Sequence, residues 1–495
     1  MLRISSLPKG EQTSSLYTVT LDGLAADVYP ARVSAFPYNC GWPGHQRPLD
    51  QTEMSGFVSF ESDEAVAVRV TPSRAFHEAI VRPISKGVSV RNENGVLSFT
   101  LTEPGQYSLE LDGHHENLML FFDPIRCYPT GGENVRYYAP GIHHVGTVWL
   151  DSGETVVIER GAVVYGSFVA VDAENVRICG GGVIDGSDEK RTSSTLLLPL
   201  SRAEFGNIVK TRKGMEEYAE RNHLLHGAIR LLNCRHCSIE GVTCRDSSTF
   251  TVIPANCSDL TIDGLKAYGM WRYNSDGIDL FNCQNVLIQN TFLRCFDDCM
   301  VVKGIKGWDD RNLSNIVMKR LVIWCDWGRA LEIGAETCAD EYSNILFEDC
   351  DIIHAAYSMC DVQNGDRAYV HDVTFSNIRC EYSRHQMPES LQTDMSVPYD
   401  PTLPVTQPRI LLIQGYTGQW SKDGIAGRTE RIRFENITCY ADEGIEPATI
   451  SFTGYAEGHD TRDITIDGIT WNGKRLKREE MTFHLNEHVH GITVV

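Results

Sequence analysis

Two short acidic motifs hold the side chains of this chain that are best suited to catalysis. Residues 274–279 read Asn-Ser-Asp-Gly-Ile-Asp, and residues 296–299 read Phe-Asp-Asp-Cys. Asp297 and Asp298 follow Asp276 by 21 and 22 residues. Carboxylates that are held close together repel, so that at least one of them keeps its proton near neutral pH. A protonated acid beside an ionised base is what hydrolysis of a glycosidic bond requires.

A weak repeat that begins near residue 175 would bring these acids together. Each unit reads Asn or Asp, β-branched, any residue, β-branched, and then a polar residue with Gly or Asp. Its third apolar position recurs every 23 to 30 residues, at Ile239, Ile262, Ile288, Met318, Phe347 and Phe375. Short strands at such a period indicate a right-handed parallel β-helix, in which each coil buries its inward side chains against the next. The three acids would then lie on neighbouring coils of one face.

The rest of the chain divides around this repeat. Residues 155–158 and 162–165 are expected to form the first coils, residues 492–495 a last strand, and residues 187–226 and 383–408 inserted loops. Residues 1–125 alternate apolar and polar positions without the coil repeat, and turn signals such as Asn94-Gly95 separate their strands. This pattern predicts an antiparallel β-sandwich. We therefore predict an all-β protein with a β-sandwich over 1–125 and a parallel β-helix catalytic domain over 126–495.

The composition narrows the class of partner. The chain has 495 residues and a formal net charge of −21. This charge argues against nucleic acid and against an anionic membrane surface, and no apolar run approaches the ~20 residues of a membrane span. The polar N-terminal sequence lacks an apolar signal core, so we expect a cytoplasmic protein. The 16 cysteines scatter through apolar strand patterns and are expected to be reduced and buried.

The two acidic motifs and the coil repeat resemble glycoside hydrolase family 28, the polygalacturonases, over residues 130–470. The layout of a sandwich followed by a helix is also similar to family 49, which contains dextranase and isopullulanase. The resemblance implies a right-handed parallel β-helix and hydrolysis with inversion of configuration. It also implies roles for the acids: Asp297 protonates the leaving oxygen, whereas Asp276 and Asp298 hold and deprotonate the attacking water.

The chain departs from the polygalacturonase pattern in two places. Family members carry Gly-His-Gly about one coil after the Asp-Asp pair, and here Arg329 stands where the histidine would be. They carry Arg-x-Lys one coil later, which grips the galacturonate carboxylate, and here Asp361 and Gln363 occupy the matching place. A carboxylate and an amide cannot form a charge-assisted clamp on an acidic sugar. We therefore expect a glycoside hydrolase that is not a standard polygalacturonase.

Other polar side chains near the motifs have two interpretations each. Asn274 either orients a carboxylate or contacts sugar, or it belongs to a side-chain ladder of the turns. Arg329 either holds Asp297 or a sugar hydroxyl, or it forms a surface ion pair with Asp326 or Glu332. Strand alternation would place Glu332 opposite Arg329, and Asp279 away from Asp276, whereas Asp361 and Gln363 would share one face. Lys303 either reaches the site or is a solvated turn lysine.

Aromatic residues and an N-terminal loop complete the candidate site. One or two of five aromatic residues are expected to line the cleft: Trp271, Tyr273, Trp308, Trp324 and Trp327. Residues 36–47 are rich in polar and aromatic groups and include His45 and Arg47. This loop either closes one end of the cleft or packs at the domain interface. A closed end would suit an exo-acting enzyme.

We read the sequence as an inverting glycoside hydrolase that acts on an oligosaccharide or polysaccharide and needs no cofactor or catalytic metal. One alternative is a β-helix polysaccharide lyase, for which an acidic site would bind Ca²⁺, or a fructotransferase-type enzyme. Another is a non-catalytic carbohydrate-binding β-helix, against which the three acids argue. Formation of a homo-oligomer stays open.

Overall fold

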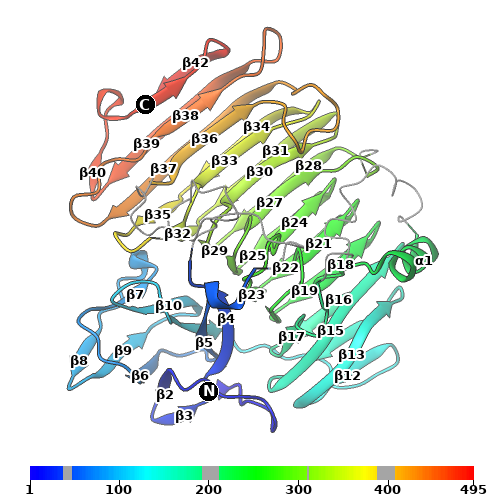
Figure 1. Ribbon diagram of the computed structural model, residues 1–495, viewed down its shortest axis with the longest axis vertical. Coiled ribbons are helices and arrows are strands. Elements are labelled where there is room, and N and C mark those ends of the chain that lie inside the picture. Colours follow the sequence, from blue (N-terminus) through cyan, green and yellow to red (C-terminus); the bar gives the residue numbers. More distant parts are fainter. Residues whose placement is uncertain (37–46, 192–210, 309–310, 387–406) are drawn as a thin grey trace.

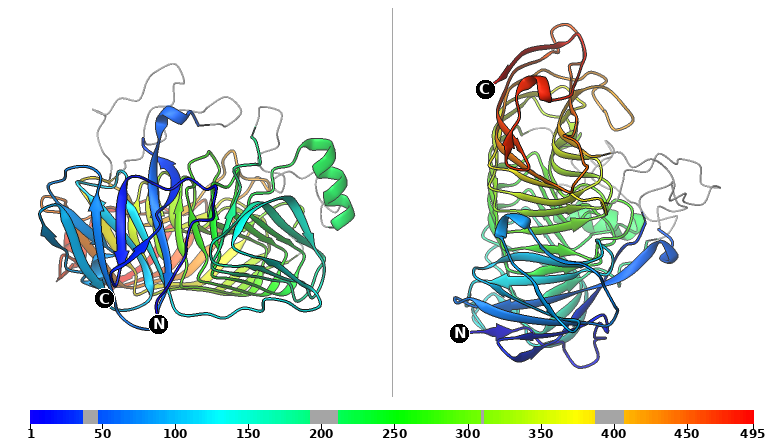
Figure 2. Two further views of the ribbon diagram at one scale, coloured as in Figure 1. Left: turned by 90° about the horizontal axis from the view of Figure 1, so that it is seen from below. Right: turned by 90° about the vertical axis from the view of Figure 1, so that its left-hand side faces the viewer.

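The computed structural model describes residues 1–36, 47–191, 211–308, 311–386 and 407–495, so His45 lies outside the described residues. Its largest part is a column of stacked coils that runs from β12 (Val135–Tyr138) to β42 (Val489–Val494) (Figure 1). Two smaller sheets, formed by residues 3–123, lie against the N-terminal half of this column (Figure 2). The predicted all-β class, a parallel β-helix with an N-terminal β-sandwich, is confirmed. The exact domain boundary stays a prediction.

Each coil contributes one strand to each of three parallel sheets, because strand n pairs with strand n + 3 through most of the column. The first sheet, which carries the acidic motifs, contains β18 (Ile229–Leu232), β21 (Val252–Ala255), β24 (Ile278–Phe281), β27 (Met300–Gly304), β30 (Arg329–Thr337), β33 (Ser358–Asn364), β36 (Arg409–Gly415), β38 (Ile450–Thr453) and β41 (Phe483–Leu485). The second contains β14 (Thr155–Ile158), β16 (Arg177–Gly180), β19 (Arg235–Glu240), β22 (Ser258–Asp263), β25 (Gln284–Gln289), β28 (Leu313–Lys319), β31 (Glu341–Glu348), β34 (Tyr369–Ser376), β37 (Thr429–Ala441) and β39 (Thr461–Trp471). The third contains β17 (Val183–Asp185), β20 (Thr243–Arg245), β23 (Lys266–Tyr268), β26 (Phe292–Cys295), β29 (Val322–Cys325), β32 (Asp351–Ala355) and β35 (Arg379–Tyr382). The long strands β13 (Gly141–Leu150) and β15 (Ala162–Val171) open the column.

The repeat of the sequence is the register of the second sheet. Its third apolar positions pair directly from coil to coil, from Ile239 to Phe375, and the row continues to Phe434 and Ile466. Phenylalanine rings of this row stack, with centroids 4.6 Å apart between Phe347 and Phe375. The asparagines that open several of these units also form hydrogen bonds from coil to coil.

These asparagines form a ladder near the start of the second-sheet strands β25, β28 and β31. Asn315 donates from Nδ2 to Oδ1 of Asn285 at 3.1 Å, and Asn344 donates to Asn315 at 3.4 Å. All three have a positive φ of 55° to 58°, a left-handed conformation that asparagine tolerates better than most residues. The repeat therefore records both the buried row and a left-handed residue near the start of each strand.

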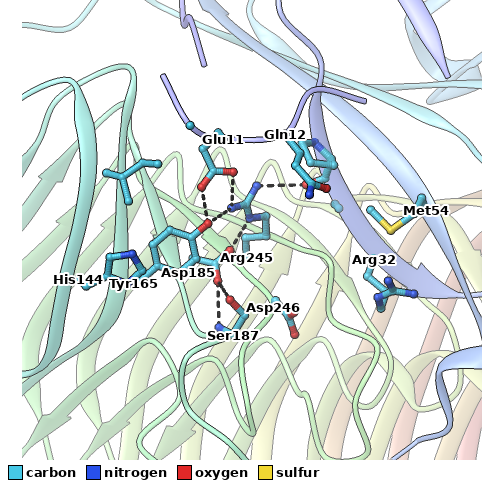
Figure 3. Close-up of a pocket in the computed structure, with 14 residues that line it drawn as sticks. Glu11, Gln12, Arg32, Met54, His144, Tyr165, Asp185, Ser187, Arg245 and Asp246 are labelled. Carbon is cyan, nitrogen blue, oxygen red and sulfur yellow. Dashed lines mark hydrogen bonds and ion pairs between the residues drawn. The ribbon is translucent and has the colours of Figure 1, made fainter. Parts of the chain in front are cut away.

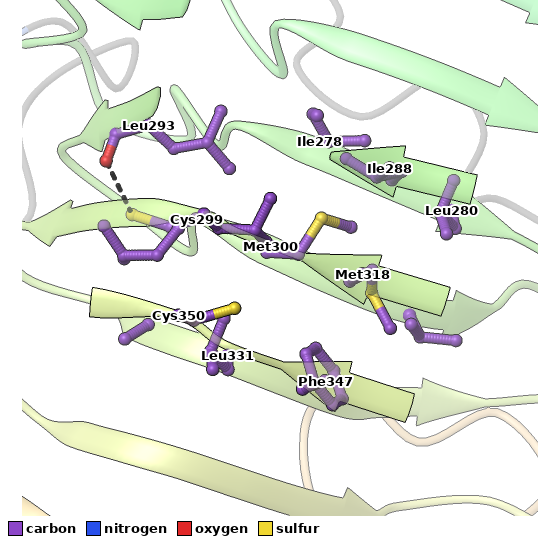
Figure 4. Close-up of a cluster of buried hydrophobic side chains, with 14 of the residues drawn as sticks. Ile278, Leu280, Ile288, Leu293, Cys299, Met300, Met318, Leu331, Phe347 and Cys350 are labelled. Atoms are coloured by element: carbon purple, nitrogen blue, oxygen red, sulfur yellow. Dashed lines mark hydrogen bonds between the residues drawn. The ribbon is translucent and has the colours of Figure 1, made fainter. Parts of the chain in front are cut away.

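The inward side chains of all three sheets form one continuous apolar core inside the column (Figure 4). In the first sheet, Ile278 pairs with Met300 and Met300 with Leu331, and all three are fully buried. Among the described cysteines, Cys127 is exposed and the others are buried, and all are free thiols. Apart from Cys127, the described cysteines meet the expectation of reduced, buried side chains, and Cys234 and Cys237 belong to the core.

The N-terminal unit consists of two facing sheets around an apolar core of its own. One sheet contains β1 (Arg3–Ile4), β4 (Tyr29–Ser34), β5 (Thr52–Glu61), β7 (Ala79–Arg82), β10 (Gly105–Leu111) and β11 (Leu118–Asp123). The other contains β2 (Tyr17–Leu21), β3 (Leu24–Ala26), β6 (Val66–Pro72), β8 (Arg91–Glu93) and β9 (Val96–Leu101). The pairings are antiparallel, as predicted for a sandwich, except that β5 and β11 run parallel.

The sandwich packs on the outer face of the third sheet. Phe57 and Phe121 of the sandwich contact Tyr268 and Phe292 of the helix, with ring centroids 5.3 to 6.1 Å apart within the cluster. Buried ion pairs flank this apolar contact, among them Lys266 with Asp123 and Arg82 with Glu110.

The described residues contain one α-helix, α1 (Arg212–Asn222), which lies inside the inserted segment 187–226. Its N-cap is Thr211, whose hydroxyl accepts a hydrogen bond from the Gly214 amide at 3.1 Å. Among the described residues, no helix has the length and apolar character needed to cross a bilayer.

Candidate active site

The acidic motifs lie in the turns that connect the third sheet to the first. Asp276 precedes β24, Asp297 and Asp298 precede β27, and Arg329 begins β30. Backbone hydrogen bonds stack these turns directly: the Gly277 amide donates to the Asp298 carbonyl at 2.9 Å, and the Cys299 amide donates to the Arg329 carbonyl at 2.9 Å. The interval of one coil therefore places the acids on consecutive coils, as the sequence predicts.

Two glycines allow these turns to approach one another. A Cβ added at Gly277 would lie 2.3 Å from the Cys299 carbonyl oxygen. A Cβ added at Gly328 would lie 2.5 Å from Oδ1 of Asp298 and 2.6 Å from its backbone nitrogen. The glycine in the Asp-Gly dipeptide and the glycine before Arg329 are therefore needed for the close packing of the acids.

Lys303 binds three carboxylates at once. Its Nζ lies 3.1 Å from Oδ1 of Asp279, 3.3 Å from Oδ2 of Asp276 and 3.6 Å from Oδ2 of Asp298. The lysine side chain is only 5% exposed, so its charge is directed at the protein. Of the two interpretations drawn from the sequence, the structure places Lys303 at the site, bound to the acids.

Arg329 joins the acids to a second group of polar side chains. Its guanidinium lies 3.7 Å from each of Asp298, Glu332 and Asp361, and 4.5 Å from the ring centroid of Tyr357. The Arg329 amide also donates to Oδ1 of Asp298 at 3.1 Å. Arg329 is therefore engaged by the carboxylates around it.

Polar residues of the next coil form hydrogen bonds that hold the carboxylates around Arg329. Gln363 donates from Nε2 to Oε1 of Glu332 at 2.7 Å, and Ser358 donates to Oδ2 of Asp361 at 2.7 Å. Asp361 and Gln363 are both buried and share one face, as strand alternation predicts. They contact Glu332 and Arg329 and do not themselves line the pocket.

Burial and unequal access to the cations separate the pKa values of the two adjacent acids. Burial, aided by the neighbouring Asp298 charge, raises the pKa of Asp297 to about 8. Burial also acts on Asp298, but Lys303 and Arg329 outweigh it and lower the pKa of Asp298 below its usual value. At pH 7 Asp297 therefore holds a proton and Asp298 is ionised.

The remaining acids of the cluster have raised pKa values. Burial and the neighbouring Asp279 raise the pKa of Asp276 well above its usual value, against the effect of Lys303. Burial raises the pKa of Asp279 to about 6 and that of Asp361 to about 7. Burial and the Asp298 charge raise the pKa of Glu332 well above its usual value. The cluster therefore retains protons near neutral pH, as carboxylates outnumbering nearby cations should.

These side chains surround a small open pocket. It is lined by Phe250, Tyr273, Asn274, Asp276, Asp297, Asp298, Lys303, Trp327, Arg329, Glu332, Ala335, Glu336 and Trp420. Tyr273 and Trp327 are two of the five aromatic residues considered from the sequence. Trp271 instead donates from Nε1 to Asp246, and Trp308 and Trp324 are buried.

Sequence reasoning missed several residues of this pocket. Glu336 lies at the far end of β30, beyond the interval that the motifs define. Trp420 comes from the loop after β36, where it is 38% exposed. A tryptophan in the Gly-rich stretch 415–420 could have been noticed as a loop aromatic. Phe250 lies beside Lys303, 5.0 Å from ring centroid to Nζ.

Two expectations from strand alternation are corrected by the structure. Asp279 does not point away from the site, because it shares Lys303 with Asp276. Glu332 does not lie opposite Arg329, because the two side chains meet at 3.7 Å. The reason is common to both: Asp276 lies in a turn and Arg329 is the first residue of its strand, so alternation does not fix their directions.

Arg47 lies next to the site without lining the pocket. Its guanidinium carbon is 4.7 Å from the ring centroid of Phe296, the residue before Asp297, and it donates to the Ser34 hydroxyl at 3.0 Å. Phe296 in turn stacks on Trp327 with centroids 5.6 Å apart. Arg47 therefore packs at the interface behind the turn that carries Asp297.

One group of possible metal ligands occurs among the described residues, and it lies outside this pocket. Ligand atoms of Cys338, Asp366 and Asp423 lie within 4.8 Å of one another. Asp366 already accepts hydrogen bonds from the backbone amides of Thr337 and Asp423 at 3.1 and 2.8 Å. Asp423 pairs with Arg367 at 2.7 Å. Protein donors thus account for these acids.

Comparison with known proteins agrees with this geometry. Residues 156–387 match the family described as Glycosyl hydrolases family 28. This region is similar to family 28. The matched residues include Asp276, Asp297 and Asp298, together with Lys303 and Arg329.

Curated relatives match only part of the chain. Exopolygalacturonase X-2 of Emericella nidulans is 31% identical over 103 residues, which are 20% of this chain and 21% of that protein. Probable exopolygalacturonase B of Aspergillus terreus is 22% identical over 238 residues, 43% of this chain and 47% of that protein. The chain thus spans a fifth to about half of the length of these two relatives.

Solved structures support the fold and its layout. Dex49A from Penicillium minioluteum aligns over 99% of this chain and 96% of its own, with a TM-score of 0.64 and 13% identity. The exopolygalacturonase of Thermotoga maritima aligns over 69% of this chain and 85% of its own, with a TM-score of 0.50 and 15% identity. The family 28-like region therefore sits in a layout like that of Dex49A, with the sandwich included.

Proposed function

We propose that this protein is an inverting glycoside hydrolase that cleaves a neutral oligosaccharide or polysaccharide. The observation that carries the proposal is a pair of adjacent buried acids of which Asp298 lies against Lys303 and Arg329. This arrangement raises the pKa of Asp297 to about 8 and lowers that of Asp298. Groups with pKa values pushed apart at one site are the usual acid and base of hydrolytic enzymes. Family 28 likeness supports the same reaction class.

The residues divide the reaction as follows. Asp297 donates its proton to the oxygen of the departing sugar, and Asp298 accepts a proton from the attacking water. Asp276 helps to hold that water, because its Oδ1 is buried and has no hydrogen-bond partner among the described residues. Lys303 keeps Asp298 ionised, and Arg329 supports it from the other side. Inversion follows if the water attacks the face opposite to the leaving oxygen.

The charge of the pocket favours a neutral sugar over galacturonate. Its lining contains five carboxylic acids, Asp276, Asp297, Asp298, Glu332 and Glu336, and two cations, Lys303 and Arg329. Both cations are already bound by carboxylates of the protein. Neither cation is therefore available to clamp a galacturonate carboxylate. Asp361, in the coil behind the pocket, supplies no further cation.

The product pattern tests this proposal. Neutral gluco- and galacto-oligosaccharides and oligogalacturonates are incubated with the wild type and with Asp297→Asn, and new reducing ends are measured. We expect hydrolysis of a neutral series by the wild type, loss of activity in the variant, and inverted anomeric configuration in the first product by NMR. We also propose exo action, as the names of the matched relatives suggest, so that one product size should accumulate.

Each other outcome has a definite meaning. Cleavage of oligogalacturonates alone would contradict the neutral substrate and leave the hydrolase assignment intact. An unsaturated product that absorbs in the ultraviolet would show a lyase. Retained activity in Asp297→Asn would contradict the assignment of the acid.

A further inference from the structure

A second pocket lies at the seam between the sandwich and the first coils (Figure 3). Its volume is about 480 Å³, within the range of roughly 300–1,000 Å³ that small-molecule sites occupy. We propose that this seam pocket is a distal subsite, which binds a neutral sugar residue of the same saccharide chain that is cleaved at Asp297. The inference rests on the proposed function and adds a substrate contact to it.

The seam pocket belongs to the same stack of turns as the catalytic acids. Ser187 and Asp246, which line it, follow the third-sheet strands β17 and β20. Asp276 and Asp297 follow β23 and β26, the next two strands of that sheet. Neighbouring strands lie about 4.8 Å apart, so Asp246 and Asp297 are separated along the column by roughly 10 Å. One saccharide chain that lies along the turns can span this distance.

Strand β4 of the sandwich follows the turns from one pocket to the other. The Pro30 carbonyl accepts a hydrogen bond from Nη1 of Arg245 at 3.2 Å, beside the seam pocket. One coil further, a Cβ added at Gly269 would lie 3.4 Å from the carbonyl oxygen of Arg32. The guanidinium of Arg47 reaches Phe296, next to Asp297. The sandwich therefore flanks the turns between the two sites.

A short segment of the helix connects the same two sites. Asp246, in the wall of the seam pocket, accepts hydrogen bonds from Nε1 of Trp271 at 2.8 Å and from Nε of Arg272 at 3.1 Å. The next two residues, Tyr273 and Asn274, line the carboxylate pocket. Residues 271–274 therefore have one end at each pocket.

The lining of the seam pocket suits a neutral, hydroxylated ligand. The buried Arg245 forms ion pairs with Asp185 and with Glu11, which also accepts from the Tyr165 hydroxyl. Toward the cavity, Arg32 and Gln12 can donate hydrogen bonds to sugar hydroxyls (Figure 3). The charge of Arg32 offsets the second carboxylate that pairs with Arg245, so these groups together carry little net charge to attract or repel an ionic group.

An aromatic surface is also present. The His144 ring stacks on the Tyr165 ring with centroids 4.7 Å apart and planes 14° apart. The His144 side chain nevertheless stays 63% exposed. A flat ring with one side supported and the other accessible can pack against the C–H face of a sugar.

The test uses substrate length. The double variant Arg32→Ala with His144→Ala removes groups that bind neither the acids nor the cleaved bond, and Arg91→Ala, on exposed strand β8, is the control. Neutral gluco-oligosaccharides from disaccharide to heptasaccharide are the probes. We expect kcat/KM of the double variant to fall about tenfold for the longest substrates and to change by less than about twofold for the shortest one cleaved.

An equal loss at every length, or no loss at any length, would overturn the subsite. If the wild type cleaves none of the probes, hydrolysis of this neutral series fails by itself, and binding of the heptasaccharide by calorimetry then decides the subsite. Binding about tenfold weaker in the double variant than in the wild type and Arg91→Ala would support it. Equal binding by all three proteins, or no binding by the wild type, would contradict it.

Discussion

The carboxylate pocket and the sandwich–helix interface both contain buried charged groups. The pKa values of two of their acids nevertheless shift in opposite directions. At the interface, Glu110 accepts hydrogen bonds from Nε of Arg82 at 3.0 Å and from Nε2 of His354 at 2.9 Å. These two partners outweigh burial and lower the pKa of Glu110 to about 2. In the pocket, burial prevails at Asp297 and raises the pKa to about 8. Burial alone therefore does not make an acid reactive.

What differs is the number of cations that each carboxylate can reach. Glu381 at the interface illustrates the intermediate case, because it shares Arg82 with Glu110 and its pKa is raised by burial to about 7. In the pocket, Lys303 is divided among three carboxylates. A surplus of acids over cations leaves protons in the cluster, and these protons are available for catalysis.

The largest loss of activity is expected when Asp297 is replaced. Asp297→Asn cannot donate the proton that the leaving oxygen needs, so kcat/KM should fall by about 10²- to 10⁴-fold, with little change in thermal stability. Rates with a cleaved oligosaccharide and thermal unfolding of both proteins provide the measurement. Activity that survives unchanged would mean that another group is the acid.

Replacement of Glu110 should lower stability and leave activity unchanged. Glu110→Gln removes the carboxylate that Arg82 and His354 share, but Arg82 keeps its ion pair with Glu381. The free energy of unfolding should therefore fall by about 1–3 kcal/mol, while kcat of the folded enzyme stays the same. Glu103→Gln, which breaks an exposed pair with Lys86, is the control and should cost less than about 1 kcal/mol. Denaturant unfolding measures both.

The depressed pKa of Glu110 should also make the stability of the protein depend on pH. The pKa of Glu110 is depressed in the folded state, so its contribution is present above the ordinary value of about 4.5 and is lost as the pH falls toward 2. The wild type should lose stability over that window, and Glu110→Gln should show a flatter curve. Identical curves would contradict the pairing.

A change in geometry without a change in charge should have a smaller effect on catalysis. In Gly328→Ala the new methyl group meets Asp298 at 2.5 Å and must displace the turn. A displacement on the ångström scale should reduce kcat by roughly 10²-fold. Gly131→Ala is the matched control, because a Cβ there has no neighbour within 4 Å. Equal kinetics in the two variants would show that the close approach is unimportant.

The smallest effect is expected for Lys303→Met. Loss of this cation removes stabilisation of ionised Asp298, so the pKa of the base should rise and the acidic limb of kcat/KM should move to higher pH. Arg329 remains near Asp298, so a shift of about 1 unit is expected, the lower end of the 1–3 units that a nearby charge can cause. An unmoved acidic limb in the pH profile would show that Lys303 does not control the base.

The sequence predicted the fold because its repeat is local and periodic. The row from Ile239 to Phe375 pairs as the spacing requires, and the acids on consecutive coils follow from that register. The contribution of Glu336 to the pocket could not be predicted, because the length of β30 brings it there. Trp420 could be noticed as a loop aromatic, but the repeat does not fix the position of its loop.

Strand alternation also gave the wrong directions for Asp279 relative to Asp276 and for Glu332 relative to Arg329. Asp276 lies in a turn and Arg329 is the first residue of its strand, so alternation does not fix their directions.

The protonation of Asp297 is the most direct test of this account. Carbon-13 NMR of enzyme labelled at the aspartate carboxyl carbon can follow each titration without a substrate, and Asp297→Asn assigns the resonance. The account predicts an aspartate signal that titrates near pH 8 in the wild type and is missing in the variant, together with a signal for Asp298 that stays ionised down to low pH. A wild type in which the Asp297 carboxyl is already ionised at pH 6 would contradict it.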